Sequence, residues 1–126
     1  MTHRQFFDAL RDLGPLRIIS PSGPSLFEAI CRVDRWGVGE GYMNAFTDAY
    51  HWHVELARFR HLTARDDTHA RSGRRVLFFE LREDAGREPF LLVYLHREKG
   101  EEFSAERETL FGSLRARLAT EAGVQS

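Results

Sequence analysis

Two histidines separated by a single residue, His51 and His53, are the side chains of this sequence best spaced to act together. Apolar and polar residues alternate across residues 50–56, and this alternation predicts a strand. Residues two apart in a strand project from the same face, about 6.5–7 Å apart at the backbone. Two imidazoles in this position can bind one zinc or non-haem iron ion. Further ligands could come from Glu55 on the same face, His61 or His69.

The alternative without a bound ligand is a histidine pair that faces solvent on one side of a sheet and makes only hydrogen bonds. Haem is another candidate ligand, with a different geometry. Its two axial ligands approach the iron from opposite faces of the porphyrin. One histidine would therefore bind the iron while the other contacts a propionate, and Tyr42 and Trp52 would supply flat apolar contact. Arginines would pair with the propionate carboxylates, and the candidates downstream are Arg58, Arg60, Arg74 and Arg75.

Other chemistries find little support in the sequence. It contains no Gly-x-Ser-x-Gly turn, and Cys31 lies among apolar neighbours in an alternating segment. The glycines of residues 37–41 are not followed by Gly-Lys-Ser/Thr, so they do not form a phosphate-binding loop. The basic cluster at residues 71–75 follows two aspartates and has no aromatic ladder around it. We therefore expect no nucleic-acid partner.

The composition bounds the class of protein. A chain of 126 residues fits one domain, residues 1–126. Its 18 basic and 19 acidic side chains leave a net charge of −1, which excludes nonspecific polyanion binding. Lys99 is the only lysine beside 17 arginines, and six of these arginines follow His53 within 22 residues. That placement favours a small ligand bearing two carboxylates as the charge partner.

The cysteine content and the N-terminus predict a compartment. Cys31 is the only cysteine, which is typical of a reducing interior such as the cytoplasm. Charged residues from Asp8 onward interrupt any apolar run long enough for a signal peptide or a membrane span. We therefore expect a cytoplasmic protein with no membrane segment.

The segments that position the histidines follow from patterning. Thr2 and Gln5 form a capping box for a first helix that Gly14 ends. Residues 15–24, rich in proline, are predicted to be an extended connector. A strand follows from Leu26, with Phe27, Ala29, Cys31 and Val33 on its drier face.

The second half of the chain alternates strands and turns. A glycine-rich turn at residues 36–41 leads to strands at 42–46 and 50–56, and a fourth strand is expected near 59–62. Residues 64–73 are predicted to be a mobile loop, and 76–81 and 90–95 to be a central hairpin. Ser104 caps a last helix with an apolar stripe. The fold class predicted is α+β: an antiparallel β-sheet flanked by N- and C-terminal helices.

The order of these segments resembles a known family. Four segments show the resemblance. They are Gly41-Tyr42-Met43-Asn44, the histidine strand Tyr50-His51-Trp52-His53-Val54, the Phe78-Phe79 strand with its Gly86 turn, and residues 90–98. Together they resemble the intracellular haem-utilisation carriers of the ChuX/HutX type and, more distantly, HemS-like proteins. The resemblance covers about residues 26–118. The chain departs from the family pattern at residues 63–67 and 96–99.

The resemblance implies a cytoplasmic homodimer that binds haem without catalysis and passes it to a haem-accepting enzyme. It implies iron ligation by the histidine strand, and thus by His51 or His53. On chemical grounds Tyr42, Arg74 and Arg75 are predicted to contact the same haem. Two alternatives remain. One is a haem-degrading or metal-dependent enzyme that uses the histidine face, and the other is an interaction module on the same fold that has lost haem binding.

Overall fold

The computed structural model describes all residues from Met1 to Ser126, with helices at both ends and antiparallel strands between them. The predicted α+β class is confirmed, but the strands form two sheets rather than one. The elements in chain order are α1 (His3–Asp12), β1 (Leu16–Ser22), β2 (Ser25–Cys31), β3 (Val33–Gly39), β4 (Tyr42–Thr47), β5 (His51–Glu55), the 3-10 turn η1 (Leu56–Arg58), β6 (His61–Thr68), β7 (Arg75–Arg82), β8 (Leu91–Leu95) and α2 (Ala105–Leu118).

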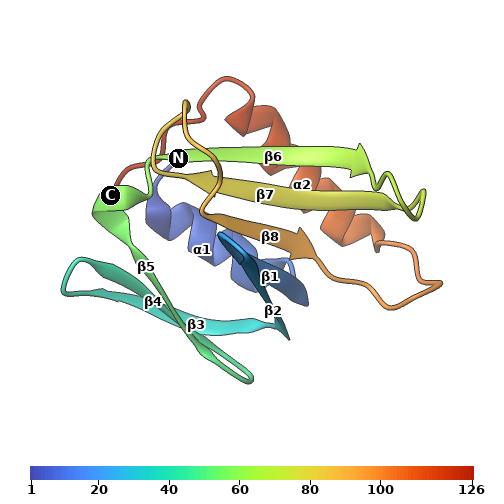
Figure 1. Cartoon of the computed structure of the whole chain (residues 1–126), viewed down its shortest axis with the longest axis horizontal. Coiled ribbons are helices and arrows are strands. Elements are labelled where there is room, and N and C mark those ends of the chain that lie inside the picture. Colours follow the sequence, from blue (N-terminus) through green and yellow to red (C-terminus); the bar gives the residue numbers. More distant parts are fainter.

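The larger sheet has the strand order β2-β1-β8-β7-β6 and the smaller one has the order β3-β4-β5. All neighbouring strands are antiparallel. The chain passes from one sheet to the other at Arg32, between β2 and β3. Figure 1 shows α2 behind the larger sheet and α1 between the two sheets. This arrangement leaves β2 and β5 as edge strands of different sheets.

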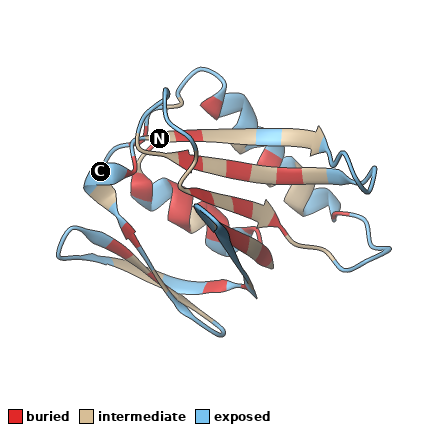
Figure 2. Cartoon of the chain, viewed as in Figure 1, coloured by how far each residue is buried: buried red, intermediate tan, exposed pale blue.

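The core lies where α1 meets both sheets. The ring of Phe6 lies 5.2 Å from that of Phe79 in β7, and Phe7 lies 5.2 Å from Trp52 in β5. On the other side of the contact, Phe111 of α2 lies 5.1 Å from Phe79. Figure 2 shows buried residues in red on both helices and on the inner strands. Each large side chain buried this way contributes about 1.5–3 kcal/mol, so α1 holds the small sheet against the large one.

The predicted start of α1 is confirmed in detail. Thr2 Oγ1 accepts from the Gln5 backbone N–H at 3.1 Å, and Gln5 Oε1 accepts from the Thr2 N–H at 2.9 Å. Gly14 ends the segment with φ 78°, a left-handed conformation that favours glycine. Buried His3 donates from Nε2 to the Phe59 carbonyl at 2.6 Å, which ties α1 to the segment after β5.

The connector predicted at residues 15–24 is wrong, because these residues form β1 and the turn that leads into β2. β1 lies inside the larger sheet, between β2 and β8, and buries Ile18 and Ile19. Only residues 16–19 pair with β8, so both Pro15 and Pro21 lie outside that ladder. Proline lacks a backbone N–H and is tolerated where no ladder bond is required of it.

The mobile loop predicted at residues 64–73 is also wrong over its first half. β6 continues to Thr68 and pairs with β7 along its whole length. It is an edge strand, and an edge strand tolerates charged side chains that pair with each other. Arg65 pairs with Asp67 at 2.8 Å and Asp66 with Arg75 at 2.8 Å, so the polarity that suggested a loop belongs to strand pairs.

Two further expectations need adjustment. The glycine-rich turn is shorter than predicted: β3 runs to Gly39, and only Glu40 and Gly41, with φ 54° and 81°, make the turn. The drier face expected on the strand from Leu26 is only partly buried, since Cys31 is buried but Phe27 is 66% exposed. Figure 2 shows most of β2 in pale blue. None of the helices has the length and apolar character needed to cross a membrane.

Candidate functional site

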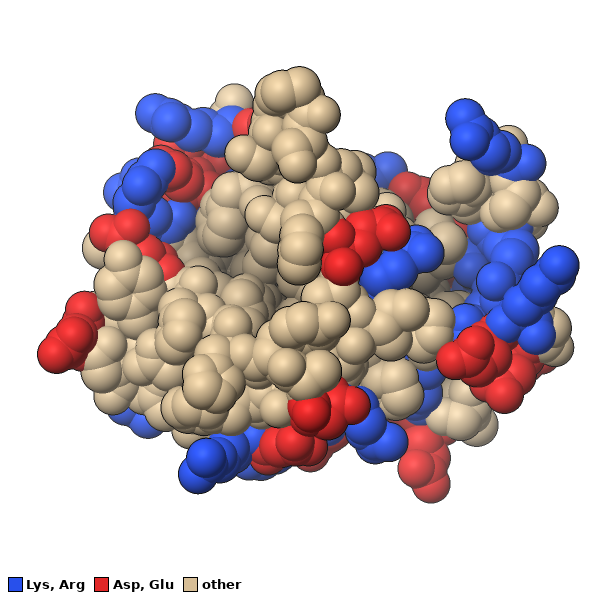
Figure 3. All heavy atoms as spheres, turned by 60° about the horizontal axis from the view of Figure 1, so that its bottom comes forward, with Lys and Arg blue, Asp and Glu red and all other residues tan.

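A cavity of about 510 Å³ opens between the two sheets. One wall comes from β1 and β2, including Ile18, Phe27 and Ala29, and the opposite wall is β5. Phe90 and Leu91 close it from the larger sheet. Figure 3 looks onto this side of the molecule and shows a hollow bordered mainly by uncharged side chains. A concave, largely apolar cavity of this size is typical of a small-molecule or cofactor site.

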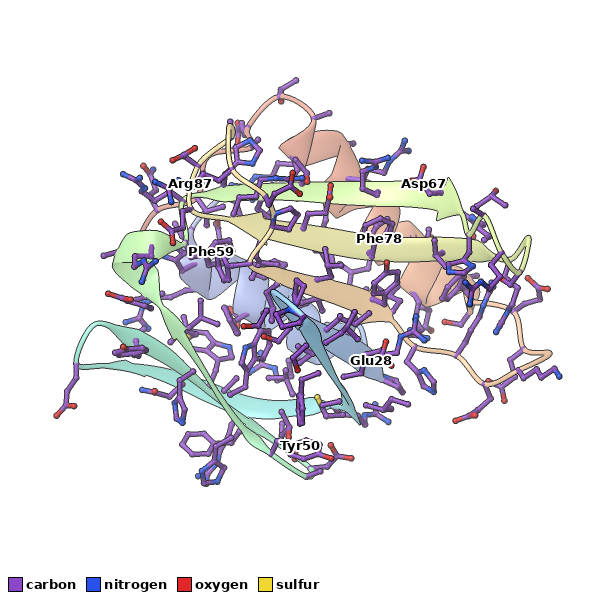
Figure 4. The ribbon with its side chains drawn as sticks, viewed as in Figure 1. Glu28, Tyr50, Phe59, Asp67, Phe78 and Arg87 are labelled. Carbon is purple, nitrogen blue, oxygen red and sulfur yellow. The ribbon has the colours of Figure 1, made fainter.

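The edge position of β5 explains why residues of both its faces border this cavity. Val54 is buried and Trp52 half-buried toward α1, while His51 and His53 are exposed on the other face. The strand predicted from alternation is therefore confirmed, as is the shared face of the two histidines. Their ring centroids lie 6.4 Å apart with a 84° angle between the ring planes. Figure 4 shows Tyr50, a further lining residue, at the hairpin end of β5.

His53 is held in one orientation by its neighbour on β4. Asn44 lies directly opposite His53 in the strand register, and its Oδ1 lies 2.7 Å from His53 Nδ1. Because a carbonyl oxygen only accepts, Nδ1 carries the proton and donates. In the neutral ring Nε2 is then unprotonated and free to bind a metal, and such a fixing partner is typical of metal-binding histidines. His51 instead packs against Phe46, with 5.1 Å between ring centroids.

A charged cluster lies at one end of the cavity. Arg58 donates from Nε and Nη2 to Glu83 Oε1 at 3.1 and 2.5 Å, and its Nη1 lies 3.8 Å from Glu55 Oε2. The hydrogen bond to Glu83 is the main cause that raises the pKa of Arg58. Tyr42, which pairs with Glu55 across the hairpin, lines the same end. Arg58 is the only basic side chain besides the histidines that lines this cavity.

The other predicted residues do not join this group. Arg74 and Arg75 line a different cavity of about 340 Å³, together with His69. The structure thus brings Tyr42, His51 and His53 together and places the two arginines elsewhere. His61 lies at the start of β6, where its Nδ1 is buried without a hydrogen-bond partner.

The protein-only metal site considered from the sequence does not form. No three His, Cys, Asp or Glu side chains gather in a way that could hold a metal ion. His61 and His69 therefore do not complete a ligand set with the histidine pair. Two imidazoles on one strand remain, and a metal bound there would need ligands from outside the chain.

Several lining residues escaped sequence reasoning. Ile18 comes from the segment predicted as a connector, Glu83 from a turn, and Phe90 from a strand expected only to be central. The partner of Arg58 lies 25 residues downstream, and no local pattern links them. Phe27 is the one lining residue for which the sequence offered a signal, because it is an aromatic residue on the apolar face of a predicted strand. In the fold its side chain stays exposed and lines the cavity.

Cys31 is expected to react with iodoacetamide about tenfold more slowly in the folded protein than in the unfolded chain. The residue is 3% exposed and lines the cavity. Burial raises the pKa of its thiol, and the nearby Asp48 carboxylate raises it further. Less thiolate is therefore present at a given pH. Alkylation rates at pH 8 with and without guanidinium test this, and equal rates would contradict it.

Comparisons with known proteins place this geometry in a structural context. No protein-family model matches the chain, and no curated protein sequence matches it. The heme-binding protein ChuX superposes with a TM-score of 0.78 at 15% identity, covering 93% of this chain and 72% of ChuX. A protein from Agrobacterium tumefaciens superposes with a TM-score of 0.76 at 18% identity, covering 90% of this chain and 65% of that one.

A longer protein contains the same fold as a part. ChuS, an E. coli heme oxygenase, superposes with a TM-score of 0.71 at 16% identity over 88% of this chain but 33% of its own. The chain thus spans less than two thirds of the Agrobacterium protein and about a third of ChuS. The predicted resemblance is confirmed at the level of the fold: this chain shares the fold of the heme-binding protein ChuX and of part of the heme oxygenase ChuS.

Proposed function

We propose that this protein binds haem in the cavity between the two sheets and acts as a non-catalytic haem carrier. The observation that carries the proposal is His53, whose Nε2 is free while Asn44 holds Nδ1, beside a largely apolar cavity. The likeness to the heme-binding protein ChuX supports it through the fold. His53 is the proposed iron ligand, and His51 is its neighbour on the same face.

The residues present fit the size and polarity of a porphyrin. The cavity volume of about 510 Å³ lies within the range of about 300–1,000 Å³ found for ligand sites. Ile18, Phe27 and Phe90 offer apolar surface to the macrocycle. Neutral imidazole is a common axial ligand of haem iron, which would supply the porphyrin's redox-active centre when bound.

The propionates have one arginine available at this cavity. Arg58 is exposed and already bonded to Glu83, so a propionate must share or replace that carboxylate. Tyr42 at the same end adds a hydroxyl that can donate. Arg74 and Arg75 line the other cavity, so the proposal leaves them outside the haem site. The homodimer, the cytoplasmic location and the haem-accepting enzyme implied by the resemblance stay predictions.

Hemin titration of the purified protein tests the proposal. We expect a shifted Soret band that saturates near a one-to-one ratio of haem to chain, because one cavity carries the imidazole ligand. Absence of a Soret shift or of saturation would remove the proposal. In that case the protein would instead be the interaction module proposed above as an alternative, and a pull-down should identify its partner.

The same complex separates a carrier from an enzyme. ChuS shares this fold and is a heme oxygenase, so haem degradation is the second candidate. A carrier should keep its Soret band when ascorbate is added to the aerobic complex. Loss of the band with release of iron would instead assign a degrading activity to this chain.

A further inference from the structure

We propose that the second cavity binds a small anion with phosphate chemistry. It measures about 340 Å³ and lies between β1, β8, the β6–β7 turn and the segment after β8. Figure 3 shows lysine and arginine atoms gathered at this end of the molecule. Its basic and imidazole lining side chains are Arg17, Arg74, Arg75, Arg97, Lys99, His69 and His96, and its single carboxylate is Glu98.

Two of these cations are already neutralised or fixed. Arg75 pairs with Asp66 at 2.8 Å and with Glu108, which satisfies its guanidinium. Arg97 donates to the Arg75 carbonyl at 2.6 Å, and its guanidinium lies 4.0 Å from the ring centroid of Phe103. These two arginines therefore shape the wall of the cavity.

Three cations remain without an ion pair: Arg17, Arg74 and Lys99. Arg74 reaches only the Glu98 carbonyl, at 3.5 Å from Nη2. No hydrogen bond or ion pair occupies the Lys99 ammonium. The three come from β1, the β6–β7 turn and the segment after β8, so they approach the cavity from different sides. Their summed positive charge exceeds what the one lining carboxylate can offset.

Arg17 supplies the observation that points to a ligand. Its Nε is buried and has no hydrogen-bond partner, although its guanidinium is fixed 5.1 Å above the ring of Tyr94. Tyr94 itself stacks on Phe78, with 4.6 Å between ring centroids, so this platform is rigid. A buried donor left unsatisfied costs about 1–3 kcal/mol. The Nη1 and Nη2 groups of the same guanidinium also have no hydrogen-bond partner, and these are the donors that a ligand's acceptor oxygens would reach.

The acidic side chains near the cavity do not cancel this charge. Glu98 is 76% exposed and reaches His96 at 3.3 Å. Asp67 and Glu80, which face Tyr94, pair with Arg65 and Arg82. Glu28 lies across β1 from Tyr94, on β2, and does not line the cavity.

Phosphate chemistry suits this set of donors. Guanidinium groups bind phosphate oxygens through two parallel N–H bonds, and an ammonium adds a compact charge. Three uncompensated cations match a group with two or more negative charges. No residue lines both cavities, so this site is separate from the proposed haem site.

Calorimetric titration with pyrophosphate tests the proposal, with inorganic phosphate and citrate as comparison ligands. We expect saturable one-to-one binding of pyrophosphate that Arg17→Met and Lys99→Met each weaken about tenfold, the equivalent of about 1.4 kcal/mol. Arg71→Met is the matched control, because Arg71 lies on the β6–β7 turn near Arg74, is exposed and does not line the cavity. Circular dichroism checks that Arg17→Met is folded, and Lys99→Met changes only an exposed side chain.

Three results would overturn the proposal. They are the absence of saturable pyrophosphate binding, with or without citrate binding, an equal loss in Arg71→Met, and unchanged pyrophosphate affinity in Arg17→Met and Lys99→Met. The haem proposal stands or falls separately, since Arg17→Met should leave the hemin titration unchanged. Pyrophosphate binding to a chain that fails to bind hemin would reject the haem site and support this one.

Discussion

Replacing Arg107 by methionine is expected to lower the free energy of unfolding by about 3–5 kcal/mol. The Arg107 guanidinium joins α2 to two other segments of the chain. It donates from Nε to the Leu13 carbonyl at 2.7 Å, from Nη1 to the His96 carbonyl at 2.7 Å and from Nη2 to the Pro15 carbonyl at 2.6 Å. Methionine would fill the space of the stem but leave the Leu13 and His96 carbonyls without a donor, while the Pro15 carbonyl would keep only the His96 backbone N–H.

The environment of Arg107 explains why this loss should be large. Burial lowers the pKa of its guanidinium, and the nearby Arg32 lowers it further. The charge is therefore kept in a partly buried place by its three hydrogen bonds, since no carboxylate pairs with it. Those carbonyls belong to the residue that caps α1, the residue before β1 and the residue after β8. Loss of the hydrogen bonds to them should loosen the junction between the helices and the larger sheet.

Urea denaturation followed by circular dichroism measures the effect. Arg115→Met is the matched control, because Arg115 lies on the same helix and is exposed, and its side chain has no hydrogen bond. It should change the free energy of unfolding by no more than about 0.5 kcal/mol. Arg107→Lys keeps the charge but cannot hold three carbonyls with a planar fork, so its loss should fall between the two. Equal stabilities of the two methionine variants would contradict this role.

Much of the fold could be predicted because the informative patterns were local. The capping box of Thr2 and Gln5, the Ser104 cap of α2 and the alternation across residues 50–56 each involve neighbours in the sequence. The continuous apolar segments at 76–81 and 90–95 become β7 and β8, which are inner strands of the larger sheet. An inner strand covered by helices is buried enough that its sequence is almost continuously apolar, and this pattern can be recognised without knowing its partner strands.

The errors arose where long-range pairing decides the outcome. β1 is a strand because β2 and β8 lie on either side of it, and the proline content of residues 15–24 carries no information about those partners. The same holds for β6, which pairs with β7 along its length and whose Asp66 forms an ion pair with Arg75 of β7. Local composition predicted a connector and a loop because it measures propensity, which tertiary pairing can override.

The candidate site shows the same division. The shared face of His51 and His53 follows from strand geometry and was found from the sequence. Arg74 and Arg75 follow His53 closely in the sequence but lie at another cavity. The eight residues of β6 span about 26 Å and carry the turn away from β5. In Figure 4, Tyr50 and Asp67 mark these two separate regions.

Replacing His53 by alanine is expected to weaken haem binding by about 100-fold and to shift the Soret band. This prediction depends on the proposed function. His53 Nε2 is the ring nitrogen left free by the hydrogen bond from Nδ1 to Asn44. Alanine removes the iron ligand, while the apolar wall of Ile18, Phe27 and Phe90 remains. Some affinity should therefore survive, with a changed coordination spectrum.

Asn44→Ala tests the orientation of the ligand separately from its presence. Removing a partner that fixes a metal-binding histidine costs about tenfold or more in affinity, because the ring can then rotate and change its tautomer. We expect Asn44→Ala to reduce affinity for haem by about tenfold while the Soret band keeps its position. His69→Ala is the matched control, since His69 is an exposed histidine that lines the other cavity.

Three spectra thus decide the assignment. A loss in His53→Ala, a smaller loss in Asn44→Ala and no change in His69→Ala would together identify His53 as the ligand. An unchanged spectrum and affinity in His53→Ala would reject it. The next residue to replace would then be His51, because it lines the same cavity and its ring lies 6.4 Å from that of His53. Its ring packs against Phe46 with no hydrogen bond to fix the tautomer, so either nitrogen can face the iron.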